Sequence, residues 1–169
     1  RIFDIILSLL FIIIFSPVLL LAAVIIKLDS RGPVIYKNER VLKNGAFKLF
    51  KFRSMIYQYC VGDEYGNEQA LELEKKLIAE KSLKSGPVYK IAHDPRLTGA
   101  GKFLRRWSID ELPQFFNVLK GNMSLVGPRP HQPREVAKYE RHHKKVLTVK
   151  PGLTGLAQIS GRSDLSFED

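Results

Sequence analysis

The stretch IILSLLFIIIFSPVLLLAAVII, residues 5–26, decides the fold of this 169-residue chain. It is 22 residues long and carries no charge. As a straight helix it would measure about 33 Å, enough to cross a hydrocarbon core of about 30 Å. The sequence therefore predicts a membrane-embedded helix within residues 1–30 and a separate domain over residues 31–169.

Ser16 and Pro17 interrupt this apolar run near its middle. Pro17 cannot donate a hydrogen bond to the Ile13 carbonyl, and its ring crowds the preceding turn. We expect the helix to break there into two limbs of about eleven residues, each about 17 Å long and able to reach half of a bilayer. We also expect the Ser16 hydroxyl to satisfy the freed carbonyl, because backbone polar groups in lipid must find a partner.

The residues alone leave two forms of this segment open. A re-entrant helix would turn at Ser16-Pro17 and leave on the side it entered, whereas a proline-kinked helix would span the membrane. Flanking charge does not choose between them, because Arg1 lies at one end and Lys27 and Arg31 lie at the other. A cleaved signal peptide is disfavoured, because the apolar run is long and only Arg1 precedes it. The chain does not begin with Met, and we expect it to be a piece of a longer protein.

The rest of the chain is strongly basic. The sequence holds 27 Lys and Arg against 17 Asp and Glu, a net charge of +10. The charges in residues 1–30 cancel, so the whole excess lies in residues 31–169. Such a charge favours anionic partners, namely nucleic acid, anionic lipid headgroups or phosphorylated substrates. The single cysteine, Cys60, excludes an internal disulfide and fits a reducing compartment.

Local patterns after the apolar run predict a mainly α fold with a small β-hairpin, an α+β class. The hairpin would flank Asn44-Gly45, a strong two-residue turn signal. A basic and aromatic stretch over residues 103–107 is typical of a membrane interface, although one turn of an ordinary packed helix would look the same. The expected strands cover residues 34–41 and 46–52, and the expected helices cover residues 68–82, 108–120 with Gly121 as terminator, and about 134–146.

Asp110 and Glu111 are the most informative pair of side chains. Ser108-x-x-Glu111 has the form of a capping box, a purely structural role. Pro113 conflicts with that role, because it would lie inside the helix and remove a hydrogen bond. Either the helix begins later, or it is distorted where the two carboxylates lie.

Arginines near this pair favour a chemical role. Arg105 and Arg106 precede it, and Arg129 is held in a Gly-Pro-Arg-Pro frame with little backbone freedom. Guanidinium groups suit bidentate recognition of phosphate. A carboxylate that attacks a diphosphate needs cations to screen the two negative charges, and arginine, lysine or a divalent metal does this in phosphoryl transfer.

Eight motifs in one order resemble the bacterial sugar transferases, the monotopic phosphoglycosyl transferases that begin glycan assembly on undecaprenyl phosphate. The match runs from end to end apart from residues 57–90. The motifs are Arg-x-x-Asp (1–4), Ser-Pro (16–17), Lys-x-Asp-Ser-x-Gly-Pro (27–33), Lys-Phe-Arg-Ser-Met (51–55), Asp-Pro-Arg (94–96), Asp-Glu-Leu-Pro-Gln (110–114), Met-Ser-Leu-Val-Gly-Pro-Arg-Pro (123–130) and Pro-Gly-Leu-Thr-Gly-Leu-Ala-Gln-Ile-Ser-Gly-Arg (151–162).

The resemblance implies a two-step covalent transfer. Asp110 would attack the β-phosphate of a UDP-sugar, UMP would leave, and polyprenyl phosphate would then take the sugar phosphate from Asp110. Glu111 would act as a general base or help Asp110 to hold Mg²⁺. The implied substrate- and phosphate-binding residues are Arg105, Arg129, Lys51, Arg53 and Arg162.

The resemblance also favours the re-entrant form, with interfacial helices along the membrane and a cytosolic catalytic globule. It implies the cytoplasmic face of the bacterial inner (plasma) membrane, a UDP-sugar donor and undecaprenyl phosphate as acceptor. The main rival hypothesis is a non-catalytic, membrane-anchored module that binds anionic lipid through its basic surface. A nucleic-acid binder is disfavoured, because no signature of that class is present and the apolar run has no place in it. Neither the sugar nor the oligomeric state can be predicted.

Overall fold

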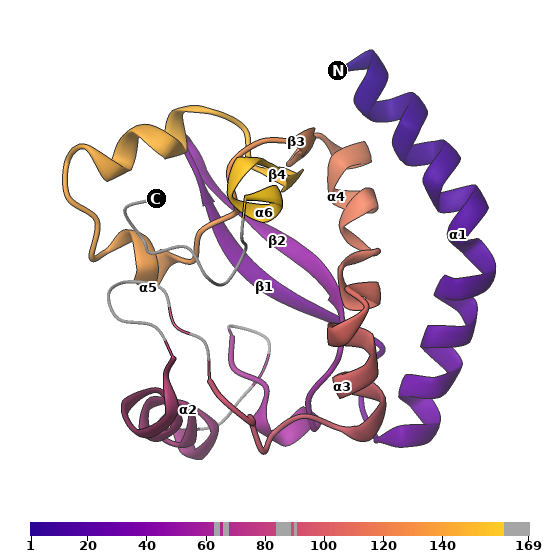
Figure 1. Cartoon of the computed structure of the whole chain (residues 1–169), viewed down its shortest axis with the longest axis vertical. Helices are drawn as coiled ribbons and strands as arrows, with labels where there is room; N and C mark the ends of the chain where they lie inside the picture. Colours follow the sequence, from indigo (N-terminus) through magenta and orange to yellow (C-terminus); the bar gives the residue numbers. More distant parts are fainter. Residues whose placement is uncertain (63–64, 66–67, 84–88, 90, 161–169) are drawn as a thin grey trace.

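The computed structural model describes residues 1–160 except 63–64, 66–67, 84–88 and 90. A long N-terminal helix, α1 (Ile2–Asp29), lies along one side of a body built around a two-stranded hairpin (Figure 1). Helices α3 (Gly99–Arg106) and α4 (Gln114–Lys120) lie between the hairpin and α1 (Figure 1). The predicted combination of helices with a small hairpin is confirmed at this level.

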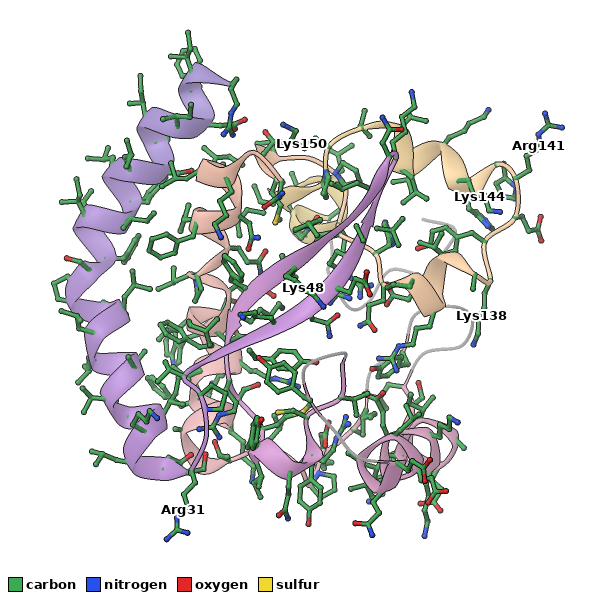
Figure 2. The ribbon with its side chains drawn as sticks, turned by 180° about the vertical axis from the view of Figure 1, so that it is seen from behind. Arg31, Lys48, Lys138, Arg141, Lys144 and Lys150 are labelled. Atoms are coloured by element: carbon green, nitrogen blue, oxygen red, sulfur yellow. The ribbon has the colours of Figure 1, made fainter. Side chains whose placement is uncertain are left out.

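Helix α1 runs without interruption through Ser16 and Pro17. The prediction that the helix breaks into two limbs is therefore wrong. The helix instead curves at its middle, as both views show (Figures 1 and 2). A proline removes only one hydrogen bond, and a bend is the usual response. The Ser16 hydroxyl donates to the Ile13 carbonyl at 2.8 Å, as predicted. Within the described residues α1 alone is long and apolar enough to cross a membrane, by length and composition.

The outer face of α1 is covered with large apolar side chains that touch little else. Leu28 is 82% exposed and Ile13 is 69% exposed. On the inner face, Ser8, Ala22 and Ile26 are buried against the body. Such an exposed apolar surface is far larger than a water-soluble chain normally leaves uncovered, and it fits a lipid environment.

Both ends of α1 are bound to the same body. At the N-terminal end, the Arg1 guanidinium donates to the carbonyl oxygens of Val118 and Leu119, the latter at 2.6 Å from Nη2. At the C-terminal end, the Asp29 carboxylate accepts from the Ala100 backbone N–H at 3.2 Å, in the first turn of α3. The bow of α1 therefore begins and ends on one globule.

The hairpin consists of β1 (Ile35–Leu42) and β2 (Gly45–Phe52), paired antiparallel. Leu42 pairs with Gly45, so the two-residue loop is Lys43-Asn44, one residue earlier than predicted. Gly45 has a φ of +137°, a conformation that favours glycine. Two buried clusters hold the hairpin to the helices: Phe52 with Ala22, Ile26 and Leu104, and Phe47 and Leu49 with Val118 and Met123.

Asn117 fixes α4 against the edge of β2. Its side chain is fully buried, its Oδ1 accepts from the Phe50 N–H at 2.8 Å, and its Nδ2 donates to the Lys48 carbonyl at 2.8 Å. A buried amide with both ends satisfied sets a single register between the two elements. This contact positions the turn that precedes α4.

The remaining elements are short except for α2 (Glu68–Lys81), which agrees with the predicted helix over residues 68–82. Strand β3 (Ser124–Val126) pairs in parallel with β4 (Gly152–Thr154), a pairing that the sequence did not predict. The single helix expected near residues 134–146 is instead two short pieces, α5 (Pro133–Val136) and a 3₁₀ helix (His143–Thr148). The other short elements are the 3₁₀ turns Tyr57–Tyr59 and Ile109–Glu111 and the helix α6 (Leu156–Ile159).

Candidate active site

A cavity of about 790 Å³ lies beside the hairpin. It is bounded by both strands, by the turn that carries Asp110 and Glu111, and by α2 and α5, which lie on the side of the hairpin away from α1 (Figure 1). Of the predicted site residues, Lys51, Arg53, Arg105, Asp110 and Glu111 all line it. The structure therefore brings five of the predicted residues to one space.

The carboxylate pair sits in a 3₁₀ turn (Ile109–Glu111), not in the first turn of an α-helix. Ser108 has a φ of +56° and its side chain makes no capping hydrogen bond, so the capping box does not form. Helix α4 begins only after Pro113, as expected if proline excludes the earlier start. A strained residue next to a functional side chain is a frequent feature of active sites.

Asp110 is almost completely buried, with 7% of its surface exposed. Burial raises the pKa of the Asp110 carboxyl above its ordinary value, and the neighbouring charge of Glu111 adds to the rise. The charges of Lys51 and Arg105 oppose it. The result is a poorly solvated carboxylate whose negative charge depends on two nearby cations.

Glu111 is bound directly by one of these cations. The Lys51 ammonium lies 2.6 Å from Glu111 Oε1. Burial alone would raise the pKa of Glu111, but the charge and hydrogen bond of Lys51, with a hydrogen bond from Gln114, bring it below the ordinary value. The two adjacent carboxyls therefore have pKa values shifted in opposite directions, which assigns them different chemical roles.

Arg105 reaches the cavity from the last turn of α3. Its Nε donates to the Ser54 hydroxyl at 2.9 Å, which fixes the guanidinium beside Asp110. Ser54 had no assigned role in the sequence, although it belongs to the Lys-Phe-Arg-Ser-Met motif. Its position is explained by this contact.

Arg53 is buried and its guanidinium binds protein oxygens, unlike an arginine that is free to bind a phosphate. It is 2% exposed, and its guanidinium donates to the carbonyl oxygens of Pro33, Ser30 and Met55 and to the Ser30 hydroxyl. These bonds occupy both Nη atoms and Nε, so the side chain joins the end of α1 to β2. With these nitrogens bound to protein oxygens, Arg53 is placed for a structural role in which it joins two elements.

Arg129, a predicted phosphate-binding residue, is not among the described residues that line the cavity. Its Nη2 donates to Glu135 Oε1 at 3.0 Å, and its side chain is 41% exposed. Its charge also lowers the pKa of Glu111, so the group lies within electrostatic reach of the dyad. Arg162 lies outside the described residues.

A buried ion network forms the wall opposite the dyad, and the sequence did not predict it. Arg96 is 2% exposed and binds Asp94 at 2.8 Å and Glu74 at 3.2 Å, while Arg134 from α5 binds the other oxygen of Glu74. Glu74, within the predicted helix over residues 68–82, is only 5% exposed. The network fixes α2 to α5 across the cavity.

The dyad can be tested as a site for Mg²⁺ by its donor set. No group of three or more His, Cys, Asp or Glu ligands occurs in the described part of the chain. Mg²⁺ is commonly held by one or two carboxylates together with substrate phosphates and water. Asp110 and the Glu111 oxygen that Lys51 does not bind supply such a pair, so the residues fit this ion.

Comparison with known proteins gives a consistent result. The family description "Bacterial sugar transferase" matches residues 1–169. The chain is 45% identical over 139 residues to "Galactosyl transferase CpsE" of Streptococcus agalactiae serotype III, covering 82% of this chain and 28% of that protein.

Two further relatives cover almost the whole chain. It is 41% identical over 172 residues to the "Undecaprenyl-phosphate galactose phosphotransferase" of Salmonella typhimurium, covering 99% of this chain and 34% of that protein. It is 41% identical over 177 residues to the "Undecaprenyl-phosphate glucose phosphotransferase" of Komagataeibacter xylinus, covering 100% of this chain and 29% of that protein. The chain spans about a third of the length of these relatives. With a match over all of its residues, this chain belongs to the bacterial sugar transferase family.

Proposed function

We propose that this chain transfers a sugar 1-phosphate from a UDP-sugar to undecaprenyl phosphate through a covalent intermediate on Asp110. The observation that carries this proposal is a buried carboxylate held between Lys51 and Arg105 in a cavity large enough for a nucleotide sugar. The printed names of two relatives describe phosphotransfer of galactose and of glucose with undecaprenyl phosphate.

In the first step, an Asp110 carboxylate oxygen attacks the β-phosphorus of the donor. The bond between that phosphorus and the oxygen bridging to the α-phosphate breaks, and UMP leaves with the bond's electron pair. The sugar phosphate remains on Asp110 as an acyl phosphate. Lys51 and Arg105 are the cations that reduce the repulsion between the carboxylate and the diphosphate.

In the second step, a phosphate oxygen of undecaprenyl phosphate attacks the phosphorus of the acyl phosphate. The bond to Asp110 breaks, the carboxylate is restored, and the product is a lipid diphosphosugar. Because each step exchanges one group, the reaction has ping-pong kinetics. Burial of Asp110 excludes water, which would otherwise hydrolyse the intermediate.

Glu111 has a different role because Lys51 keeps it ionised. A carboxylate with a lowered pKa is a poor proton acceptor but a good ligand for a cation. We propose that Glu111 with Asp110 holds Mg²⁺, which when bound neutralises negative charge on the substrate phosphates. Lys51 positions Glu111 for this task through the 2.6 Å contact.

We propose that α1 is re-entrant and that the body lies at the cytoplasmic face of the bacterial inner membrane. Support comes from the two anchored ends of α1: Arg1 and Asp29 bind the same globule. A straight helix across the bilayer would separate its ends by about 30 Å on opposite faces. A bowed helix that enters one leaflet keeps both ends on one face, where a lipid phosphate and an aqueous nucleotide sugar can meet.

The reaction class is tested by UMP release from a panel of UDP-sugars, with Mg²⁺, with and without undecaprenyl phosphate. We expect multiple-turnover release by the wild type to need the lipid, and Asp110→Asn to release none. Glu72→Gln, an exposed acid on α2, is the matched control and should behave as wild type. Absence of release from every UDP-sugar, with binding to anionic vesicles retained, would instead support the lipid-binding module.

A further inference from the structure

Arg40 is a buried cation that has no role in the reaction steps proposed above. It lies on β1, is 7% exposed, and lines the same cavity as Asp110. Because side chains alternate along a strand, Arg40 shares its face of β1 with Tyr36 and Asn38, which also line the cavity. The guanidinium therefore belongs to the wall of the active-site cavity.

The hydrogen-bonding capacity of Arg40 is largely unfilled. Its Nε is buried and has no partner, and its Nη1 makes one long contact, 3.5 Å, to the Glu39 carbonyl. No carboxylate lies within ion-pair distance of Arg40 among the ion pairs of the described residues. Buried arginines normally have a paired anion, because an unpaired buried charge is strongly unfavourable.

The neighbours of Arg40 do not compensate for this burial. Burial lowers the pKa of Arg40, Glu135 opposes the fall and the charge of Arg129 adds to it, with a net pKa of about 10. The Glu135 carboxylate is already bound by Arg129 at 3.0 Å and by the Gln132 N–H at 2.7 Å. Arg40 remains charged at neutral pH and forms no ion pair with the described residues.

Arg40 is also distinct from the cations at the dyad. Lys51 pairs across the hairpin with Tyr36, four residues along β1 from Arg40, a backbone separation of about 13 Å. Arg129 acts electrostatically on both Glu111 and Arg40, and it lowers the pKa of each. The cationic lining thus extends from the dyad along β1.

We propose that Arg40 binds a substrate phosphate and forms a second anion subsite in the cavity, separate from the phosphate at Asp110. This inference rests on the proposed function, which brings two phosphate-bearing ligands to the cavity. The nucleoside monophosphate of the donor and the lipid phosphate of the acceptor offer the same chemistry to a guanidinium fork.

The test compares Arg40→Met with Arg141→Met, an exposed arginine far from the cavity (Figure 2). Binding of UMP and of undecaprenyl phosphate in nanodiscs is measured separately and without turnover. We expect Arg40→Met to weaken one of the two ligands about 10- to 100-fold, and Arg141→Met to weaken neither. Loss of UMP binding assigns the subsite to the donor, and loss of lipid phosphate binding assigns it to the acceptor.

Thermal unfolding without ligand separates this role from a structural one. Replacing an unpaired buried charge by an apolar side chain should keep or raise the unfolding temperature of Arg40→Met. A lower unfolding temperature with loss of both ligands would overturn the proposal, as would unchanged binding of both. Arg40→Gln serves the same tests if Arg40→Met does not fold.

The proposed function and this inference can fail separately. Absence of sugar phosphate transfer by the wild type would contradict the proposed function, and the two binding measurements would still test Arg40. A wild type that binds neither UMP nor undecaprenyl phosphate would overturn the inference.

Discussion

Asp110 and Glu111 are adjacent, yet their environments separate their chemistry. Burial raises the pKa of Asp110, whereas the Lys51 contact lowers that of Glu111. An aspartate that is poorly solvated and held by cations is more reactive toward an electrophile than one stabilised by water. Replacing a cation near Asp110 should therefore change the pH dependence and the rate of the proposed reaction.

Lys51→Met should move the acid limb of the pH–rate profile to higher pH. Asp110 must be ionised to attack, and its raised pKa means that activity is lost on acidification at a higher pH than for an ordinary aspartate. Lys51 lowers the pKa of Asp110, so its removal should shift the acid limb to still higher pH. It should also reduce kcat/KM about 100-fold. The measurement is kcat/KM against pH, with Lys75→Met on the exposed face of α2 as control. An unchanged limb would show that Lys51 does not act on Asp110.

Helices and strands that are specified by sequence patterns within a few residues were predicted correctly. The hairpin, the helix over residues 68–82 and the termination of α4 at Gly121, with its φ of +84°, agree with local signals. The helix expected near residues 134–146 does not form as one unit. Its apolar anchor Tyr139 is buried and contacts His131, a contact that local patterning does not reveal.

Long-range pairing explains what the sequence could not predict in the site. Glu74 and Arg96 are 22 residues apart and Arg134 is 60 from Glu74, so nothing local indicates that they meet. The sequence around Arg40 likewise does not indicate that this side chain is buried. Asp110 and Glu111 were found because adjacent carboxylates, a proline and nearby arginines occur together in the sequence.

Glu74→Gln should destabilise the protein by about 3 kcal/mol at neutral pH, because it leaves the buried Arg96 with Asp94 alone and removes the carboxylate that binds Arg134. Burial would raise the pKa of Glu74, but the two arginines bring it below its ordinary value. Its stabilisation is therefore present above about pH 4.5 and lost as pH falls through the lower folded value.

Thermal unfolding of wild type and Glu74→Gln from pH 7 to pH 3 measures this effect. We expect the difference between them to be largest at neutral pH and to shrink on acidification. Glu72→Gln, two residues away and exposed, should change stability by less than about 0.5 kcal/mol. A difference that grows on acidification would contradict the ion network.

The proposed re-entrant form of α1 predicts that its two ends are accessible from one side of the membrane. Ile2→Cys and Arg31→Cys, both at exposed positions, should react with an impermeant maleimide only in inverted membrane vesicles. Burial raises the pKa of Cys60 to about 11, so the native thiol should give little background. Labelling of the two positions from opposite sides would show that α1 spans the bilayer.

Part of the basic charge lies on the side of the molecule opposite the apolar helix α1, whereas Arg31 lies at the end of α1 (Figure 2). Lys138, Arg141 and Lys144 lie on the side of the body away from α1 (Figure 2). If α1 lies in the membrane as proposed, these three cations are on the side of the body away from the embedded helix. The proposed attachment through α1 therefore differs from that of a module that binds lipid through its basic surface.

A triple variant with Gln at positions 138, 141 and 144 should remain in the membrane fraction and keep its activity within twofold. Each exposed cation near an anionic surface would contribute about 1 kcal/mol to membrane binding. The readout is sedimentation with membranes at low and at high salt, with the wild type alongside. Release of the variant at low salt would favour the lipid-binding module.

Intact-protein mass spectrometry tests directly for the proposed covalent intermediate on Asp110. The protein is incubated with Mg²⁺ and the active UDP-sugar in the absence of undecaprenyl phosphate, then digested to locate any added mass. We predict an adduct with the mass of one sugar phosphate on the peptide that contains Asp110, removed when undecaprenyl phosphate is added and absent in Asp110→Asn. Rapid transfer by the wild type with no adduct on that peptide, or transfer retained by Asp110→Asn, would contradict a covalent intermediate on Asp110.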